Sequence, residues 1–298
     1  MGRMDLRRLE LLLALSRQGS MRAVADTLHV TTSTVSQQVA ALAREVGTPL
    51  LEPEGRRVRL TPAGRRLADH AVTILAAVEA ARSDLDPEAT PAGTLRVAAF
   101  ATAVRRSLLP LVPVLRAGHP DVRLLIHEHE PAEALALLAA DDVDLVLTYD
   151  YNLAPATFDA AVQVAPLWTT AWSLGVPTGS GRVRGSALAV VDRFREHDWI
   201  VNSRNTADEE VVRTVASLAG FTPRIAHRAD SLDLVQDMVV AGLGVGLLPA
   251  GEPTVRGVSL RPLTGPDVVL RSYAVSRRGR EVWPPLALVL GMLAGQRP

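Results

Sequence analysis

The chain has 298 residues, no cysteine and a formal net charge of zero. The absence of cysteine excludes disulfides, thiolate metal sites and a cysteine nucleophile, and the length predicts about two domains. Residues 1–67 contain 11 Arg against 6 acidic residues, whereas residues 68–298 contain 21 Arg against 26 acidic residues. A basic head on an acidic body favours a polyanion as the partner of the head, with chance scatter as the alternative.

Three short helices are predicted in the first 46 residues. Asp5 is a suitable N-cap for the first helix, and Ser20 for a second helix over residues 21–28. A tight turn follows, and Thr31 then caps a third helix that runs to about Val46 and is stopped by Gly47. Two short helices, a tight turn and a third helix are typical of a helix-turn-helix.

The third helix has two distinct faces. Its apolar positions fall on one side of a helical wheel, namely Val35, Val39, Leu42 and Val46. A separate stripe carries small hydroxyls and an amide, namely Thr32, Ser33, Ser36 and Gln37. Such side chains approach base edges or phosphates closely and both donate and accept hydrogen bonds, so this stripe is the predicted DNA-reading surface.

A strand with alternating arginines follows the third helix. Val58 and Leu60 alternate with Arg57 and Arg59 over residues 56–61, as in a half-buried strand. By itself such a strand is more often a solvated surface. Directly behind a helix-turn-helix it is interpreted as a wing whose arginines reach phosphates or a minor groove.

The stretch GSMRAVADTLHVTTSTVSQQVAALAREVGTPLL, followed by RRVRLTPAG, resembles the head of the LysR-type transcriptional regulators, and the similarity extends more loosely over the full length. The resemblance implies that the polar stripe faces a double-stranded DNA operator and that Ser20 and the wing arginines hold phosphates. The expected DNA-contacting residues are Ser20, Thr31, Thr32, Ser33, Ser36, Gln37, Arg56, Arg57 and Arg59.

The sequence departs from the family pattern in two places. Met21 stands where the family usually has Phe, and Glu52 and Glu54 lie in a stretch that usually contains Phe and Arg. We expect the two acids to weaken the positive field beside the wing and to lower non-specific DNA affinity.

A long helix is predicted from Pro62 to about residue 86. Its apolar residues repeat with heptad spacing, namely Leu67, Ala71, Ile74, Val78, Ala81 and Leu85. The helix packs either on its own head or against a second copy, and a dimer seam is preferred because the repeat runs beyond the head. The resemblance likewise implies a homodimer, often paired into a homotetramer, which suits a two-fold operator.

From residue 94 onward, strand-like and helix-like segments alternate, which predicts an α/β layer structure with parallel strands. The expected strands are 94–99, 122–127, 143–149, 199–201, 224–228, 245–248 and 268–274. The expected helices are 105–118, 132–140, 207–219, 231–241 and 282–293.

The fold class is therefore multidomain. We expect an all-α winged helix-turn-helix head over residues 4–61, a linker helix over 62–86 and an effector-binding domain over 94–298. The resemblance implies that this last domain is two-lobed and similar to a periplasmic binding protein. Lobe I is placed at about 94–166 and 266–298, and lobe II at about 167–265, with crossings near Leu167 and Thr264.

A small-molecule effector is expected beyond the carboxyl ends of the strands, where helix N-termini present free amides. The candidate residues there are Thr102, Ala103, Tyr149, Asn202, Ser203 and Arg204. Thr102, Ser203 and Arg204 are suited to a carboxylate-bearing effector. Asp150 is predicted to place negative charge near the same cleft, which favours an amine or amino acid instead.

No cofactor, metal or catalytic role is expected. His127 and His129 point to one face of a predicted strand, but no third metal ligand is evident. The sequence contains no nucleophile elbow, Walker loop or zincin motif, and no signal peptide or membrane span is evident, so a cytoplasmic regulator is predicted. The alternatives are a small-molecule-binding protein without DNA function and an enzyme with an appended head.

Overall fold

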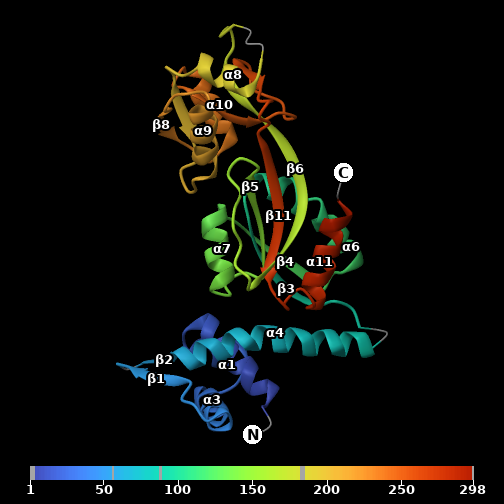
Figure 1. The fold of residues 1–298 in the computed structure, drawn as a ribbon. Coiled ribbons are helices and arrows are strands. Elements are labelled where there is room, and N and C mark those ends of the chain that lie inside the picture. The colour runs from blue at the N-terminus through green and yellow to red at the C-terminus, as the bar shows by residue number, and fades with distance from the viewer. Residues whose placement is uncertain (1–3, 56, 87–88, 182–184, 297–298) are drawn as a thin grey trace.

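The computed structural model describes residues 4–55, 57–86, 89–181 and 185–296. The helical head and the long helix α4 lie at one end of the molecule, and a two-lobed α/β body rises from them (Figure 1). Lobe I rests on α4, and lobe II lies farthest from the head. Within the described ranges, every helix is too short or too polar to cross a membrane.

The head contains the three expected helices, each begun by the predicted cap. Their bounds are α1 Leu6–Gln18, α2 Met21–Thr27 and α3 Thr32–Val46. Asp5, Ser20 and Thr31 each accept a hydrogen bond from a backbone amide in the first turn. Gly19 and Gly47 end α1 and α3 in the left-handed conformation, which glycine adopts without steric cost.

The wing is a two-stranded hairpin rather than a single strand. Strand β1 (Leu51–Glu54) pairs antiparallel with β2 (Arg57–Leu60), and Gly55 has the positive φ that a tight turn requires. The second strand was predicted from its alternation. The first was not, because its sequence of Leu-Glu-Pro-Glu has no such pattern.

Helix α4 (Pro62–Leu85) divides the predicted seam between two environments. Leu67, Ala71 and Ile74 contact the core of the chain's own head. Leu85, at the far end, is 85% exposed. The first half of the heptad repeat therefore packs within the chain, and only the second half extends past the head.

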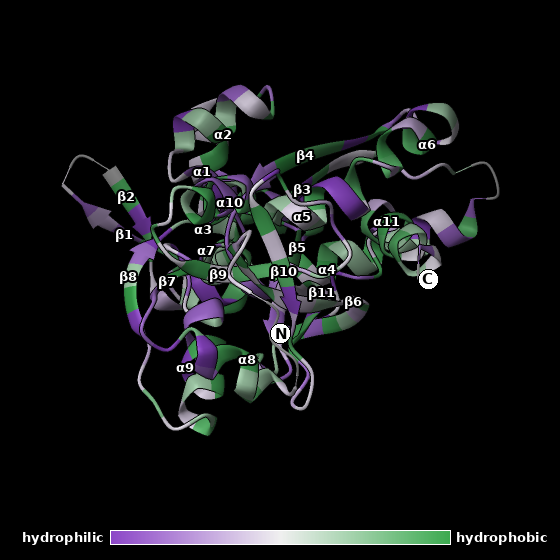
Figure 2. Cartoon of the chain, turned by 90° about the horizontal axis from the view of Figure 1, so that it is seen from above, coloured by the Kyte–Doolittle hydropathy of each residue, from purple (hydrophilic) through white to green (hydrophobic). Residues whose placement is uncertain are grey.

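Lobe I is built on three parallel strands in the order β4-β3-β5. The strands are β3 Gly93–Ala99, β4 Val122–Glu128 and β5 Leu145–Tyr151, and the helices are α6 Leu111–Gly118, α7 Pro131–Ala139 and α11 Pro284–Gly295. Helix α11 is almost wholly apolar (Figure 2) and buries Leu286, Val289 and Leu293.

Lobe II contains a second group of parallel strands, in the order β9-β7-β8. Its strands are β7 Asp198–Val201, β8 Arg224–Arg228, β9 Val245–Pro249 and the antiparallel β10 Val258–Pro262. Its helices are α8 Ala187–Arg193, α9 Ala207–Leu218 and α10 Leu232–Val240.

Two long strands join the lobes, and they add antiparallel pairs to the predicted parallel ones. Strand β6 (Val162–Pro177) pairs antiparallel with β11 (Val269–Arg277) in lobe I and with β9 and β10 in lobe II. Strand β11 also pairs antiparallel with β5. The partner of β6 changes between Ala171 and Trp172, so the first crossing runs within a continuous strand.

The expected single helix over residues 105–118 is interrupted. The structure has a short helix α5 (Ala101–Ala103), a π-helical turn η1 (Val104–Leu108) and then α6. Pro110 lies at the break, because proline has no amide hydrogen to continue the helical ladder. Helical structure also begins four residues earlier than predicted, since 101 precedes 105.

Candidate DNA-binding surface and effector pocket

The polar stripe of α3 faces outward along one side of the helix. Thr32, Ser33, Ser36 and Gln37 are all exposed, and the opposite face of the helix is buried in the head. Thr31 is exposed, and its hydroxyl lies 2.7 Å from that of Ser33. Ser20, exposed at the start of α2, accepts a hydrogen bond from Ala23 N at 3.4 Å. These residues form a rod of hydroxyl and amide groups that the rest of the chain does not cover.

The wing carries less free positive charge than its arginine count suggests. The Nε atom of Arg59 lies 2.8 Å from Glu52, and its Nη1 lies 3.8 Å from Glu54. Both acids are on β1, and the hairpin register places Glu52 directly opposite Arg59 and Glu54 two residues along the same strand. Arg56 and the side chain of Arg57 lie outside the described residues.

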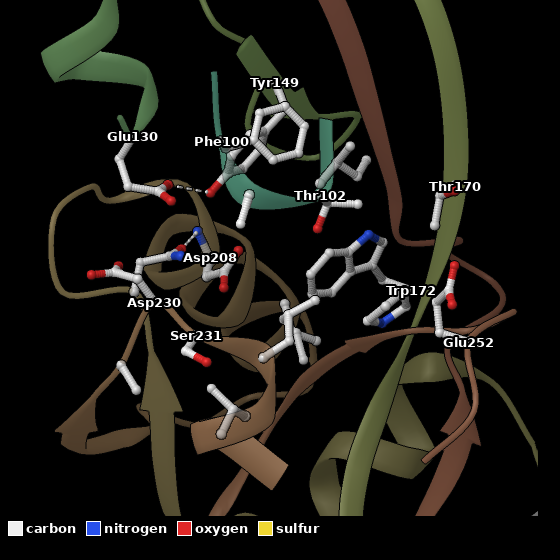
Figure 3. Close-up of a pocket in the computed structure, with 18 of the residues that line it drawn as sticks. Phe100, Thr102, Glu130, Tyr149, Thr170, Trp172, Asp208, Asp230, Ser231 and Glu252 are labelled. Carbon is white, nitrogen blue, oxygen red and sulfur yellow. Dashed lines mark hydrogen bonds between the residues drawn. The ribbon is translucent and has the colours of Figure 1, made fainter. Parts of the chain in front are cut away.

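A cavity of about 180 Å³ lies where the two lobes meet (Figure 3). Phe100, Thr102, Glu130 and Tyr149 line it from lobe I, and Trp172 lines it from β6. Lobe II contributes several polar residues, namely Asn202, Asp208, Asp230, Ser231 and Glu252. Thr102, Tyr149 and Asn202 were predicted as site residues from their positions after strands, and the structure brings them together here.

Ala103, Ser203 and Arg204 are not among the lining residues, which corrects the predicted site. Ala103 is fully buried in the hydrophobic core. The backbone amide of Ser203 donates to Asp230 at 2.8 Å and its hydroxyl donates to the same carboxylate, so Ser203 contacts a lining residue without lining the cavity itself.

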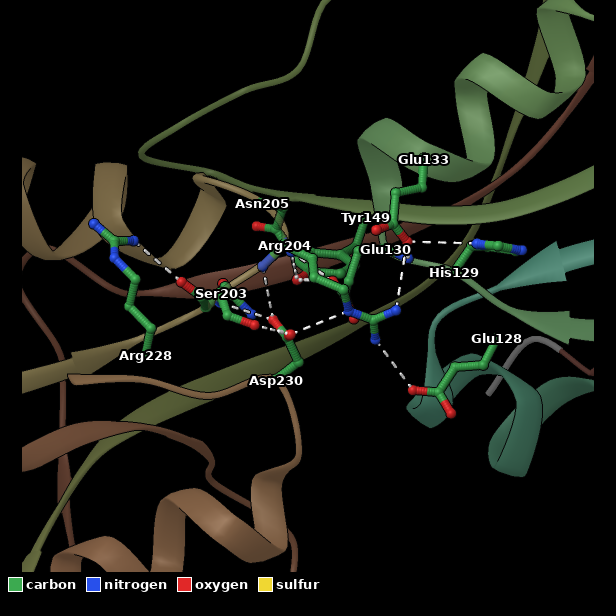
Figure 4. Close-up of polar contacts among 11 residues, drawn as sticks. Glu128, His129, Glu130, Glu133, Tyr149, Ser203, Arg204, Asn205, Arg228 and Asp230 are labelled. Atoms are coloured by element: carbon green, nitrogen blue, oxygen red, sulfur yellow. Dashed lines mark hydrogen bonds and ion pairs between the residues drawn. The ribbon is translucent and has the colours of Figure 1, made fainter.

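Arg204 is surrounded by acids (Figure 4). Its guanidinium lies 3.1 Å from Asp230, 3.4 Å from Glu133 and 3.5 Å from Glu128. Three carboxylates from different elements therefore satisfy this arginine, and it offers no free charge to an anionic effector at the position predicted.

Asp150 also differs from its predicted role. It is buried beside Arg271, whose Nε and Nη2 atoms each lie 2.8 Å from its carboxylate oxygens. Because this ion pair balances its charge and the residue does not line the cavity, Asp150 supplies no electrostatic bias to the site.

Polar side chains connect the two lobes beside the cavity. The hydroxyl of Tyr151 donates to Asp208 at 2.7 Å, and Asn205 Nδ2 donates to the hydroxyl of Tyr149 at 3.0 Å. That hydroxyl in turn donates to Glu130 at 3.1 Å. Both tyrosines are in β5 of lobe I, whereas Asp208 and Asn205 are in lobe II, so each tyrosine bridges the lobes.

Burial shifts the ionisation of the two acids in this group. The pKa of Asp208 is raised to about 7, mainly by burial, with the hydrogen bond from Tyr151 opposing the rise and the negative charges of Glu130 and Asp230 adding to it. Burial also raises the pKa of Glu130, against the opposing effect of the hydrogen bond from Tyr149. The cavity therefore contains one carboxyl group, that of Asp208, that changes charge near neutral pH.

Several lining residues were not predicted. Asp230 and Ser231 follow strand β8, so the rule that selected Asn202 would have found them. Asp208 lies in the first turn of α9, a common position for an ordinary helix-stabilising acid. Trp172 lies in a strand that the sequence pattern did not reveal.

The predicted histidine pair forms no metal centre in the described ranges, where no group of three or more potential ligands is found. The rings of His127 and His129 are 6.4 Å apart, and His129 Nδ1 lies 3.4 Å from Glu133.

The chain thus combines a helix-turn-helix head with a wing, a long helix and a two-lobed α/β domain with a pocket between its lobes. The family model for bacterial regulatory helix-turn-helix proteins of the lysR family matches residues 6–65. The model for the LysR substrate binding domain matches residues 88–297. The chain belongs to the LysR family.

Its curated relatives include transcriptional regulators of similar length. The transcriptional dual regulator GltC of Bacillus subtilis is 27% identical over 286 residues, which covers 94% of this chain and 93% of GltC. The DNA-binding transcriptional dual regulator OxyR of Escherichia coli is 28% identical over 248 residues, or 83% of this chain and 79% of OxyR.

Solved structures share the same fold. A full-length OxyR variant from Pseudomonas aeruginosa superimposes with a TM-score of 0.73 at 22% identity, covering 99% of this chain and 95% of that one. Full-length CbnR in complex with its target DNA has a TM-score of 0.54 at 20% identity, covering 98% of this chain and 100% of that one.

Proposed function

We propose that this protein is a transcriptional regulator that binds a specific operator through α3 and the wing. The observation that carries this proposal is the exposure of Thr32, Ser33, Ser36 and Gln37 along one face of a helix whose other face is buried. A helix of about 10–12 Å diameter with such a stripe fits a major groove. Because the proposed partner is chromosomal DNA, we infer that the protein works in the cytoplasm.

Binding to a labelled fragment of the gene's own upstream region, measured by fluorescence anisotropy at several salt concentrations, tests this proposal. A regulator binds that fragment more tightly than a scrambled fragment of equal length, and its affinity falls steeply as salt rises. Equal affinity for both fragments would support the alternative of a small-molecule-binding protein without DNA function.

The active form is proposed to be a homodimer or a homotetramer. The second half of α4 supports this, because Ala81 and Leu85 continue the heptad repeat beyond the head and are exposed. A two-fold dimer places two copies of α3 on two half-sites of an operator. Sedimentation of the full-length protein tests it, and a monomer that binds its operator with full affinity would contradict it.

The pocket between the lobes is proposed to bind a small-molecule effector that modulates DNA binding. A ligand there contacts both lobes, so it stabilises one relative arrangement of lobes over others. DNase footprints of the upstream region with and without a ligand that raises the melting temperature provide the test. Identical footprints would contradict this mechanism.

Peroxide sensing through thiols is not part of this proposal. Some relatives are named hydrogen peroxide-inducible genes activators, at 28% identity. The present chain has no cysteine, and thiol oxidation requires one. The signal is therefore proposed to be a bound molecule.

A further inference from the structure

The buried acids of this protein fall into two groups. Asp141, Asp144 and Asp150 are each paired with an arginine, at 2.6, 2.9 and 2.8 Å respectively. Glu130 and Asp208 are buried to a similar degree, at 5% and 9% exposure. Within the described ranges neither makes an ion pair with a basic side chain, and both line the cavity.

The hydrogen bonds of these two acids use only part of their capacity. Asp208 accepts from Tyr151 through Oδ1. Glu130 accepts from Tyr149 and Asn205 through Oε2, and its side chain also accepts from the backbone amide of Glu133 in a capping box. A carboxylate has about four lone-pair sites on its two oxygens. A buried carboxylate without a counter-ion is costly, which raises the pKa of both acids, so a cationic group that enters the cavity gains a strong interaction by stabilising their charged forms.

An independent observation comes from Trp172. Its indole Nε1 donor is buried and has no hydrogen-bond acceptor among the residues that the structure describes, and the residue is 8% exposed. The ring projects among the lining side chains of the cavity (Figure 3). Unpartnered buried donors are uncommon in folded proteins, and this one lies in a cavity lining, so it is available to an acceptor on a bound molecule.

Aromatic rings lie between these two kinds of group. The ring of Tyr151 is 5.5 Å from that of Trp172 in an edge-on arrangement, and its hydroxyl reaches Asp208. Phe100 and Tyr149 pack edge-on at 4.6 Å on the lobe I side. The cavity thus presents carboxyl groups, the arginines Arg105 and Arg106, the lone donor of Trp172 and apolar ring surface. Ring faces also attract ammonium groups.

We propose that the cavity binds a small zwitterion of the amino-acid class, with its ammonium against Asp208 and Glu130 and its carboxylate accepting from Trp172 Nε1. This inference rests on the proposed function, since it names the chemical class of the effector. A simple carboxylate, which the sequence also suggested, would leave both buried acids without a counter-ion.

The probes are the standard amino acids, and each one that raises the melting temperature is compared with its truncated analogues. For phenylalanine these are hydrocinnamate, which lacks the ammonium, and phenethylamine, which lacks the carboxylate. We expect at least one amino acid to stabilise the protein more than either of its analogues. Stabilisation by the deaminated acids alone, or by no amino acid, would overturn the proposal.

Two variants locate the binding groups by isothermal titration with the stabilising amino acid. Asp208→Asn keeps an acceptor for Tyr151 but cannot carry the negative charge. Trp172→Phe keeps an aromatic ring but removes the indole N–H donor and the five-membered ring that bears it. Each is expected to weaken affinity at least about tenfold, because a buried charge-assisted contact is lost. The exposed Asp237→Asn on α10 serves as the control and keeps the original affinity.

Unchanged affinity in both cavity variants would overturn the proposal. The upstream-DNA measurement, made without any amino acid, separates this result from a failure of the proposed function. Wild-type protein and Asp208→Asn are expected to bind that DNA equally. A wild-type protein that binds amino acids but not its upstream DNA would contradict the regulatory function and leave the ligand class supported.

Discussion

The hydroxyl of Tyr151, in β5 of lobe I, donates a 2.7 Å hydrogen bond to the carboxylate of Asp208, in α9 of lobe II. Both side chains are buried, and burial raises the pKa of each. Because the contact is buried, water does not compete for it. The titratable side chain of Asp208 therefore contributes to holding the two lobes together. The relative position of the lobes is therefore coupled to the charge on Asp208.

Replacing Tyr151 with Phe tests the strength of this bridge. The change leaves Asp208 without its side-chain donor, and an unsatisfied buried acceptor costs about 1–3 kcal/mol. We expect the free energy of unfolding in urea to fall by that amount. Tyr273→Phe is the matched control, since its half-buried hydroxyl donates to Asp150, which keeps Arg271. An equal loss in both variants would show that the bridge has no special role.

The raised pKa of Asp208 predicts a pH-dependent stability. The folded protein holds a proton on this group up to about pH 7, whereas the unfolded chain releases it above about pH 4. The stability from this proton is thus fully present below pH 4 and is lost as pH rises to 7, by up to about 1.4 kcal/mol per pH unit.

The variant Asp208→Asn removes this titration, although that of Glu130, whose pKa is also raised, remains. Its free energy of unfolding relative to wild type is expected to rise between pH 4 and pH 7 and then to level off. Urea unfolding at a series of pH values provides the measurement. Parallel pH profiles for the two proteins would mean that Asp208 is not protonated in the folded state.

Local signals explain why the head was predictable. Asp5, Ser20 and Thr31 cap helices through hydrogen bonds to residues two or three positions away, so the chain sequence alone contains the relevant interaction. The two faces of α3 follow from helical periodicity in the same way. By contrast, the burial of β6 does not alternate, and its pairing with β11 joins residues about a hundred positions apart.

The pocket was predicted only in part, because many of its contacts join residues that are far apart in the sequence. The ends of strands identified Thr102, Tyr149 and Asn202. Which charges are free depends on contacts between distant segments. Arg204 is neutralised by acids from α7, β4 and the end of β8, and no sequence pattern reports that meeting. The unpaired state of Asp208 is equally non-local.

Substitutions in α3 are expected to affect specificity rather than general DNA affinity. Gln37→Ala removes the longest donor and acceptor of the exposed stripe and should cost about 1–3 kcal/mol of preference for the operator. The salt dependence of binding should not change, since no phosphate contact by a cation is removed. Arg123→Gln, an exposed substitution in lobe I, is the control. A loss shared equally by operator and scrambled DNA would argue against base recognition by Gln37.

An ion pair links the head to lobe I. Arg17 Nε of α1 lies 2.6 Å from Asp141, which is largely buried. A double-mutant cycle with Arg17→Ala and Asp141→Asn is expected to give a coupling energy of about 0.5–1 kcal/mol in urea unfolding, because Arg17 remains partly exposed. Additive effects of the two substitutions would mean that the pair does not contribute to holding the head against the body.

The wing acids provide the last prediction. Glu52 lies 2.8 Å from Arg59 and Glu54 lies 3.8 Å from it, so both neutralise the arginine before it meets DNA. Glu52→Gln frees that charge, and one more phosphate contact should steepen the slope of log affinity against log salt by about 0.9. Affinity for scrambled DNA should rise at low salt.

Glu54→Gln is the matched control, since it changes the net charge by the same amount. Because Glu54 lies farther from Arg59 than Glu52 does, we expect a smaller gain in DNA affinity from it. The comparison separates two causes. If the effect arises from the freed arginine, Glu52→Gln raises DNA affinity more than Glu54→Gln does. If it arises only from the long-range electrostatic field, the two substitutions give equal gains, because each removes one negative charge from the same hairpin. Equal gains would therefore remove Arg59 from the set of DNA-contacting residues while leaving the basic head itself in place.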